Sequence, residues 1–539
     1  MKLLAWFRKT FRGDRILILI LLLAFSIRVF GLGAAPFFDE AVWRFPVEEM
    51  LKGSLQSYIY YIPHPPLSVL LFSVFAFFGG VSINVLRSMP LFIGLITIIV
   101  SYYFAKSLYN RRAAVISALI MAVIFYPVWM SLWIDSDGSV LTLFLIASLF
   151  SFHKLEKTSD KRWLLAAGVF FGLALLSKYV AVLLIPVLLL YDFVSNRLKN
   201  LKLIAASAVI GLVVFSIFPL LAFMFNSPDT FMNTLGYGAR NLGRSDVQNV
   251  FYSYALSLGK LFVFLFQYGT PILCLLPLYS LRKSEKREYI LFSFAIIILV
   301  FYAFVIPGGS KARYIMPAVP ALAILASKSI SEIFRKFDRN DASKFICLFA
   351  AALALLSLLN AYGTQEAFNS QKLKPSLLLQ NSMFWYSGFA SVPFAIHVHS
   401  LIFVIAASIA LFLLSLKFGK FFVIALISLG LAFNFFILFQ SFNPTVGPDF
   451  TRTVSQMVEY YKAGNFNCTL YSTEKTFMFY LNDVEFYETL QKGLKGCVLT
   501  MNVQDFYETE TFKNAFETCK KINPFYSNGF DIGRFYICG

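Results

Sequence analysis

The chain has 539 residues, of which 58% are hydrophobic and only 14% are charged, and its mean hydropathy is +0.70. This composition excludes an ordinary soluble protein and predicts an α-helical polytopic membrane protein. The net charge of +18 does not indicate nucleic-acid binding, because the basic residues lie in short clusters between apolar runs, as in cytoplasmic loops of membrane proteins. We therefore expect membrane lipids, and no nucleic acid, as partners.

The first apolar run, Ile16 to Leu32, follows a basic N-terminal stretch and could be mistaken for a signal peptide. It is longer than the apolar core of an ordinary signal peptide, and Arg28 lies inside its far end. We therefore expect a retained first helix whose N-terminus is cytoplasmic.

About thirteen apolar runs approach the length needed to cross a membrane. They are residues 16–33, 84–105, 113–130, 138–152, 163–177, 179–194, 201–225, 259–280, 289–306, 314–333, 345–359, 399–416 and 421–440. A further run, Leu67 to Phe78, has only about a dozen residues, so we expect it in or along the outer leaflet. Omitting it as a span places every basic cluster between spans in the cytoplasm.

This topology brings the acidic motifs to the opposite, extracytoplasmic side. Charged groups beside apolar spans are costly unless they face water or a polar cavity, so Asp39 and Glu40 mark the first candidate active site. His64 follows in the same outer region, framed by prolines. The plainer alternative is that Asp39 and Glu40 form a solvated loop pair and that His64 only starts a helix.

The last part of the chain is more polar than the rest. We expect a membrane domain over residues 1–442 and a small extracytoplasmic α/β domain over 443–539, with a helix at Thr451 to Lys462 and strands such as Thr469 to Ser472. This domain holds Cys468, Cys497, Cys519 and Cys538. Four cysteines in an oxidising compartment predict one or two disulfides, with three possible full pairings that stay open.

An outward-facing carboxylate can act as a general base on an incoming hydroxyl. A phosphate leaving group is already acidic and needs charge stabilisation more than a proton. One carboxylate with nearby cations therefore suffices for a single inverting displacement. Asp39 is the natural base, and Glu40 would serve the acceptor or the structure.

Asp135 and Asp137 lie two residues apart at the outer end of a span. This spacing can present oxygen ligands to a divalent cation, so a metal ion at Asp135, Asp137 and His64 stays open. His397 and His399 form a weaker pair that is more often only interfacial.

Outward cations are exceptions to the positive-inside rule and are therefore informative. Five lie at or near outer helix ends, where an anionic lipid headgroup would sit: Arg28, Arg87, Lys178, Lys311 and Arg313. Interfacial anchoring explains any one of them at least as well, but the five together, near two acidic motifs, indicate a phosphate pocket. Arg240 and Arg244 are weaker candidates.

Several motifs occur in a characteristic order. They are Phe38-Asp39-Glu40-Ala41, His64-Pro65-Pro66-Leu67, Arg87 with Met89, the turn Trp133 to Gly138, Ser177-Lys178-Tyr179 and the stretch Ser310 to Pro320. In this order they resemble the polyprenyl-phosphate-sugar-dependent glycosyltransferases of the GT-C superfamily. Within it, the chain is similar to the protein O-mannosyltransferase and aminoarabinose-transferase branch, glycosyltransferase family 39 and its neighbours.

The resemblance covers about Arg28 to Pro320. It implies a GT-C fold, a polyprenyl (dolichyl or undecaprenyl) phosphate-linked sugar donor and a hydroxyl or phosphate acceptor on a protein, lipid or glycan. It also implies that Asp39 is the base, that Asp137 is the second catalytic acid, with Asp135 as an extra acid able to replace or assist it, and that Tyr179 and Tyr314 belong to the substrate site. The cell membrane is the expected location, with the active site outside.

The chain departs from the family at one turn, where many relatives have a basic residue and this chain has Leu132-Trp133. A secondary transporter or flippase of lipid-linked sugars is the main alternative, but its charges should lie near the membrane midplane in paired repeats. A receptor-like protein that displays the C-terminal domain is a further alternative. It would leave the outward acids without a role.

Overall fold

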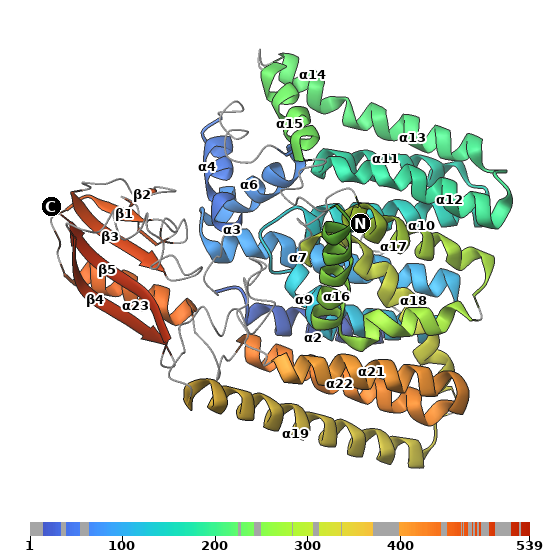
Figure 1. Ribbon diagram of the computed structural model, residues 1–539. Helices are drawn as coiled ribbons and strands as arrows, with labels where there is room; N and C mark the ends of the chain where they lie inside the picture. The colour runs from blue at the N-terminus through green and yellow to red at the C-terminus, as the bar shows by residue number, and fades with distance from the viewer. Residues whose placement is uncertain are drawn as a thin grey trace. The chain divides into compact units, whose positions relative to one another are not determined.

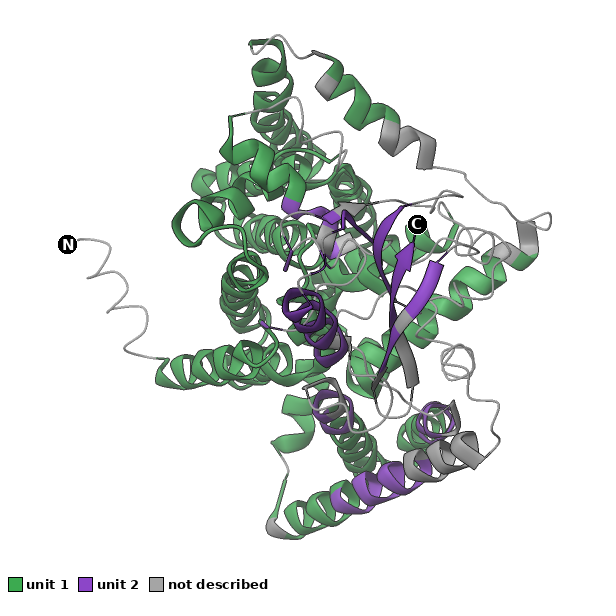
Figure 2. Ribbon diagram, turned by 90° about the vertical axis from the view of Figure 1, so that its left-hand side faces the viewer, with its two compact units in different colours: residues 1–32, 45–349, 408–434 green, residues 33–44, 350–407, 435–539 purple. Residues whose placement is uncertain are grey.

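The computed structural model describes residues 14–33, 39–53, 64–224, 228–241, 250–282, 284–304, 312–335, 337–369, 398–442 and most of 450–538. The described chain is mostly helical, with one small sheet near the C-terminus (Figure 1). It divides into two compact units (Figure 2). Unit 1 comprises residues 1–32, 45–349 and 408–434, and unit 2 comprises 33–44, 350–407 and 435–539.

The helices of unit 1 follow one another closely along the chain. They are α2 (Arg15–Val29), α4 (Arg44–Leu51), α6 (Leu67–Gly79), α7 (Ile83–Leu108), α8 (Arg111–Val123), α9 (Phe125–Met130), η1 (Asp137–Leu141), α10 (Thr142–Thr158), α11 (Lys161–Ser177), η2 (Tyr179–Leu183), α12 (Leu184–Asn196), α13 (Leu201–Phe215), α14 (Ile217–Met224), α15 (Pro228–Asn241), α16 (Val250–Leu281), η3 (Lys286–Glu288), α17 (Tyr289–Phe304), η4 (Ala312–Ala318) and α18 (Val319–Phe334). Three more helices each contain residues of both units: α19 (Arg339–Asn369), α21 (Val398–Phe418) and α22 (Lys420–Phe442).

Ten helical stretches of the described chain are long and apolar enough to cross a membrane. They are Ile83–Leu108, Asp137–Thr158, Tyr179–Asn196, Leu201–Met224, Tyr254–Leu281, Lys286–Phe304, Ala312–Phe334, Asn340–Leu359, Ser400–Phe418 and Lys420–Phe439. The expected polytopic helical architecture is confirmed, but the count of thirteen is not. The three other predicted spans are helical yet shorter: α2 has 15 residues, α11 has 17, and residues 113–130 divide into α8 and α9.

Local sequence signals explain several helix ends. The Asn110 side chain accepts the backbone N–H of Ala113 at 3.0 Å and so caps the start of α8, and Asp160 caps α11 in the same way through Arg162. The run from Leu67 forms the 13-residue helix α6, which is shorter than a membrane span.

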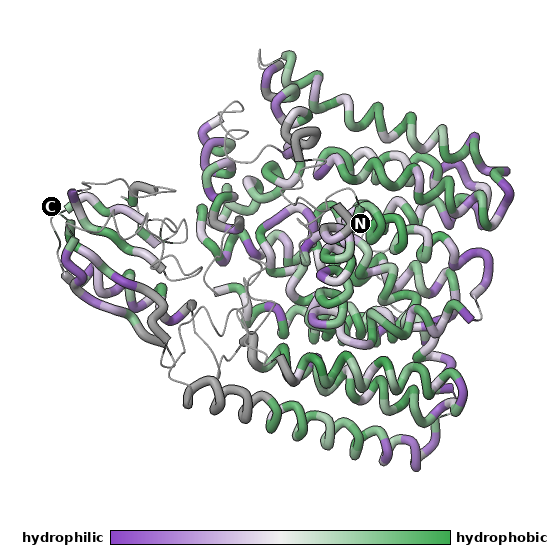
Figure 3. The backbone as a smooth tube through the Cα atoms, in the orientation of Figure 1, coloured by the Kyte–Doolittle hydropathy of each residue, from purple (hydrophilic) through white to green (hydrophobic). Residues whose placement is uncertain are grey.

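Helix α18 lies at the centre of unit 1, where it packs against α7, α8 and α16 and is almost wholly buried. Helix α13, in contrast, exposes apolar side chains such as Val209, Leu212 and Val213. Figure 3 shows that hydrophobic residues, in green, make up most of the helical part of the chain. An exposed apolar helix surface is what a lipid bilayer would cover.

The C-terminal sheet belongs to unit 2. Its strands are β1 (Leu470–Ser472), β2 (Val484–Phe486), β3 (Gly496–Met501), β4 (Cys519–Ser527) and β5 (Phe530–Cys538), in the order β2-β1-β3-β5-β4. The β1 strand pairs in parallel with β2 and β3, whereas β5 is antiparallel to β3 and β4. Helix α23 (Phe450–Ala463) packs on the sheet and buries Met457 against Leu499 and Phe535. The predicted small α/β fold is therefore present.

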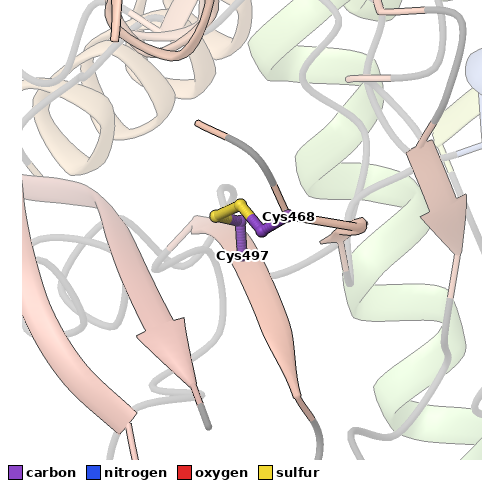
Figure 4. Close-up of a disulfide and its surroundings, with 2 residues drawn as sticks. All are labelled: Cys468 and Cys497. Atoms are coloured by element: carbon purple, nitrogen blue, oxygen red, sulfur yellow. A yellow bond between two sulfur atoms is a disulfide. The ribbon is translucent and has the colours of Figure 1, made fainter. Parts of the chain in front are cut away.

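The structure selects one of the three possible disulfide pairings. Cys468 bonds to Cys497, which joins the chain before β1 to β3 (Figure 4), and Cys519 bonds to Cys538 across β4 and β5. The Cα atoms of the two pairs are 5.7 and 4.0 Å apart. Both disulfides therefore cross-link neighbouring parts of one small sheet. Such cross-links are common in small extracellular domains, because their hydrophobic cores are limited in size.

Candidate active site

The site is built where several helices of unit 1 start or end. Asp135 lies in the irregular segment after α9, and Asp137 is the first residue of the π-helical turn η1, which leads into α10. Both carboxylates are buried, with Asp137 fully inaccessible. A π-helical turn inside a membrane helix is rare and often marks a functional site.

Lys178 pairs with Asp137 because α10 and α11 form an antiparallel hairpin. Asp137 lies just before the first helix and Lys178 just after the second, so 41 residues of separation bring them to the same end. The ammonium Nζ lies 2.8 and 2.6 Å from the two Asp137 oxygens. Burial would lower the pKa of Lys178, but the charges of Asp137 and Asp135 outweigh it and raise that pKa. Lys178 is therefore a fixed cation at neutral pH.

Arg313 brings a second cation to the same acids. It lies in the 3₁₀ turn η4, which packs against η1, and its Nη1 is 3.1 Å from an oxygen of Asp135. Its Nε is 3.9 Å from Asp137. Burial would raise the pKa of Asp135, but the charges of Arg313, Lys178 and His64 outweigh it and lower that pKa. Asp135 therefore stays ionised.

Tyr314 contributes an aromatic face beside the two cations. Its ring stacks on Tyr302 with centroids 4.5 Å apart, and the Lys178 ammonium and Arg313 guanidinium lie 5.5 and 5.7 Å from its centroid. Cations at this range are attracted to the ring face. Tyr314 therefore helps to fix the positions of both cations.

The next residue along η1, Gly138, has no room for a side chain. A Cβ atom there would lie 2.8 Å from the sulfur of Met316 and 3.0 Å from the carbonyl oxygen of Met130. Neither neighbour is a surface group, because both residues are buried. Glycine therefore allows η1, η4 and the end of α9 to meet closely.

Two more predicted residues lie near this network. The Tyr179 hydroxyl is hydrogen-bonded to Thr234 of α15. His64 is half-buried before α6, and its charge acts on Asp135. The structure therefore brings His64, Asp135, Asp137, Lys178, Tyr179, Arg313 and Tyr314 into one region of unit 1.

Two predicted phosphate ligands bind backbone carbonyls. Arg87 is buried in the first turns of α7 and donates to the carbonyls of Gly31 and Leu32 at 3.2 Å, just after α2. Arg28 is fully buried, and all five of its N–H groups donate to protein oxygens. Since no donor remains, we leave Arg28 out of the candidate phosphate pocket.

The predicted base lies in unit 2. Asp39 begins the short helix α3 (Asp39–Val42), in which the side chain of Glu40 is buried. The predicted positions Lys311, Arg244 and His397 lie outside the described residues, and for Arg240 and His399 only the helical backbone is described.

The acids do not form a metal site in the part of the chain that the structure describes. No three His, Cys, Asp or Glu side chains gather there around a possible ion. Asp137 turns both oxygens toward Lys178, and the two oxygens of Asp135 meet Arg313 and the backbone N–H of Ser136. The predicted set of Asp135, Asp137 and His64 therefore does not fit a divalent cation.

Sequence reasoning missed the residues that support this network. Tyr302 lies inside an apolar span, Thr234 lies in α15, and Gly138 was named only as the end of a motif. Tyr126, also missed, donates its hydroxyl to the carbonyl of Ala312, next to Arg313. Polar aromatic residues within apolar runs were the available signal.

Comparisons with known proteins found a matching family model and similar solved structures. A family model described as dolichyl-phosphate-mannose-protein mannosyltransferase matches residues 63–221. No curated protein sequence matches the chain. The crystal structure of ArnT from Cupriavidus metallidurans, bound to undecaprenyl phosphate, superposes with a TM-score of 0.61 at 17% identity, covering 96% of this chain and 97% of ArnT.

Two other solved structures are similar at lower scores. The oligosaccharyltransferase AglB from Archaeoglobus fulgidus has a TM-score of 0.48 at 14% identity, covering 98% of this chain and 74% of AglB. The Pmt1-Pmt2 complex of S. cerevisiae has a TM-score of 0.34 at 21% identity, covering 40% and 34%. The match to ArnT shows that the chain shares the fold of that protein, and residues 63–221 match the mannosyltransferase family model.

Proposed function

We propose that the protein transfers a sugar from a polyprenyl-phosphate donor, dolichyl or undecaprenyl, to a hydroxyl or phosphate acceptor on the extracytoplasmic face. The anomeric configuration inverts, and Asp39 is the general base. The observation that carries the proposal is the buried network of Asp137, Lys178 and Arg313, built in a fold shared with a protein that was solved with undecaprenyl phosphate.

Lys178 and Arg313 form the centre of the proposed donor pocket. A guanidinium can grip two phosphate oxygens at once, and an ammonium adds a third charge-assisted bond. Asp137 meets Lys178 from one side, and a lysine ammonium has three N–H groups, so donation to a phosphate need not break the pair. We include Tyr314 beside them, and Lys311, Arg87, His64 and Tyr179 as surrounding contacts.

The acids keep these cations charged and in place before the donor arrives. Lys178 and Arg313 balance the charges of Asp135 and Asp137, so each cation has a fixed partner. Preorganised charges stabilise a developing anion without reorganising during the reaction. In this proposal Asp137 positions Lys178. This role differs from the predicted role of Asp137 as a second catalytic acid.

The transfer itself is a single displacement. The acceptor oxygen forms a bond to the anomeric carbon as the bond from that carbon to the phosphate oxygen breaks. The electron pair of the broken bond stays on the polyprenyl phosphate, where Lys178 and Arg313 stabilise its added negative charge. The proton of a hydroxyl acceptor passes to Asp39, whereas an ionised phosphate acceptor needs no base.

The extracytoplasmic orientation is part of the proposal. The two disulfides of unit 2 support it, because such bonds persist in oxidising compartments. We also propose the cell membrane as the location and retain residues 1–442 and 443–539 as functional domains. In a variant without Cys347, a cysteine placed at Ser159 should react only with a reagent applied from the cytoplasm. Labelling of that cysteine from outside would reverse the topology.

Purified protein in detergent, supplied with labelled polyprenyl-phosphate sugars, tests the donor class. We expect release of polyprenyl phosphate coupled to a glycosylated acceptor, with inversion at the anomeric carbon. Arg313→Gln should lower kcat together with kcat/KM, because the contact strengthens as the phosphate gains charge. Arg162→Gln, in an exposed residue at the start of α11, is the matched control and should behave like wild type. Unchanged kinetics of Arg313→Gln would remove Arg313 from the pocket.

A further inference from the structure

The chain breaks between α8 and α9, inside the stretch that was predicted as one span. Pro127 explains the break, because it has no N–H to donate to the carbonyl of Val123, four residues earlier, and its ring would clash with that carbonyl in a continuous helix. Ile124 accordingly has an extended backbone, with ψ at 139°. The last carbonyls of α8 therefore lose their helical partners inside an apolar environment, where an unsatisfied group costs several kcal/mol.

Two side chains from distant helices replace the lost bonds. Asn434 of α22 donates to the carbonyl of Val123 at 2.9 Å and accepts the N–H of Phe125 at 2.7 Å. Arg28 of α2 donates to the carbonyls of Met121 and Ala122 at 2.9 and 3.0 Å. The break is therefore satisfied by two residues from outside α8 and α9.

Arg28 also reaches the far side of the break. It donates to the carbonyl of Pro127 at 3.2 Å and, through Nε, to the hydroxyl of Ser131 at 2.9 Å. Ser131 in turn donates to Pro127 at 2.6 Å and lies against Gly94 of α7, where a Cβ atom would be 2.5 Å from its hydroxyl. Ser131 is thus fixed between two helices.

Ser131 begins the irregular segment that carries the acids of the site. The chain runs from it through Trp133 to Asp135, whose N–H donates to the Trp133 carbonyl at 3.0 Å, and then into η1 at Asp137. The N–H groups of Ser131 and Trp133 bond to the carbonyls of Pro127 and Trp129, so the start of the segment is held by α9 as well as by Arg28. The course of the segment toward Asp135 depends on how this start is held. We infer that Arg28 is a positioning residue, which sets the place of Asp135 and Asp137 through the break and Ser131.

This role differs from that of a phosphate ligand. The Arg28 guanidinium is 0% exposed, and its five N–H groups already meet five oxygens, the remaining one being the carbonyl of Ala24 in its own helix. A ligand role would require these bonds to break. A positioning role needs no contact with substrate and acts on the geometry of the acids.

Two kinds of variant test the inference, which takes its activity readout from the proposed function. Arg28→Lys keeps the charge but has three N–H groups in place of five, and Arg28→Gln has two. We expect each to lower kcat at least tenfold, with donor KM within about twofold of wild type, because small displacements of catalytic groups are costly in rate. A rise in donor KM alone, with recovery by lysine, would instead make Arg28 a phosphate ligand.

Pro127→Ala removes the cause of the break, whereas the Arg28 variants remove the hydrogen bonds that satisfy it. It restores an N–H that can bond to Val123 and so favours a continuous helix, which should preserve or raise the melting temperature while lowering kcat at least tenfold. If the break had only a structural role, the melting temperature would not be preserved while kcat falls. Wild-type activity in a stable Pro127→Ala variant would overturn the inference.

Hydrogen exchange gives a readout that is independent of any activity. Peptides covering residues 121–136 should exchange faster in Arg28→Gln and in Asn434→Leu than in wild type, whereas peptides from β3 should not change. Exchange in residues 121–136 that matches wild type would contradict the inference even if the protein used another donor. Failure of transfer in wild type, with the expected exchange, would count against the proposed function alone.

Discussion

Replacing Lys178 alone should destabilise the protein more than replacing Lys178 and its partner acid Asp137 together. In Lys178→Met, Asp137 keeps a fully buried carboxylate whose nearest remaining cation is the Nε of Arg313, 3.9 Å away. Breaking a buried ion pair by removing one partner typically costs about 3–5 kcal/mol, because the other charge remains desolvated. We therefore expect a large fall in the melting temperature of Lys178→Met.

The double variant Lys178→Met with Asp137→Asn should recover most of that stability, because the uncompensated charge is gone. It should not recover transfer, since the donor phosphate still lacks a cation. Thermal unfolding in detergent and donor kinetics, measured on the wild type, both single variants and the double variant, form the assay. Simple additivity of the two stability losses would refute the coupling. Recovered activity in the double variant would show that Lys178 is not needed for the phosphate.

Three further predictions use the same preparations. The pKa of Asp135 in the folded protein is below its usual value, so its ionised form contributes stability above the unfolded-state pKa and loses this contribution only as the pH falls through the lowered pKa. The difference in melting temperature between wild type and Asp135→Asn should therefore stay constant from about pH 5 to 8. A difference that vanishes near neutrality would contradict this. Gly138→Ala should cost about 1–3 kcal/mol and reduce transfer, whereas Gly259→Ala, with open space around it, should be neutral or slightly stabilising. Opening the Cys519–Cys538 bond, which spans 19 residues, should cost about 3 kcal/mol and speed proteolysis at β4 and β5; equal proteolysis with and without reductant would contradict this.

Hydropathy and charge allowed much of the fold to be predicted, because membrane helices must be long, apolar and internally hydrogen-bonded. All thirteen predicted spans coincide with helices, and the basic clusters lie between them. The break at Ile124 was missed although Pro127 was visible in the sequence. A proline does not always break a span, since Pro90 lies inside the continuous helix α7. What differs at Pro127 is the presence of Asn434 and Arg28, which come from distant parts of the sequence.

The candidate site was predictable to the extent that its residues lie at the ends of helices. Asp137, Lys178 and Arg313 all do, and the structure joins them. Arg28 carries the same sequence signal, an arginine near a helix end, yet its five partners are protein oxygens that only the packed structure brings to it. Sequence position alone could not separate a cation that faces a ligand from one that binds backbone.

In the proposed reaction, Asp39 deprotonates a hydroxyl acceptor during sugar transfer from a polyprenyl phosphate. The most direct measurement compares transfer by wild type, Asp39→Asn and the control Asp160→Asn, which changes an exposed carboxylate at the start of α11. We expect Asp39→Asn to lose a factor of about 10² or more in rate at an unchanged melting temperature, while Asp160→Asn stays near wild type. Retention of more than half of the wild-type rate by Asp39→Asn would show that Asp39 is not the general base.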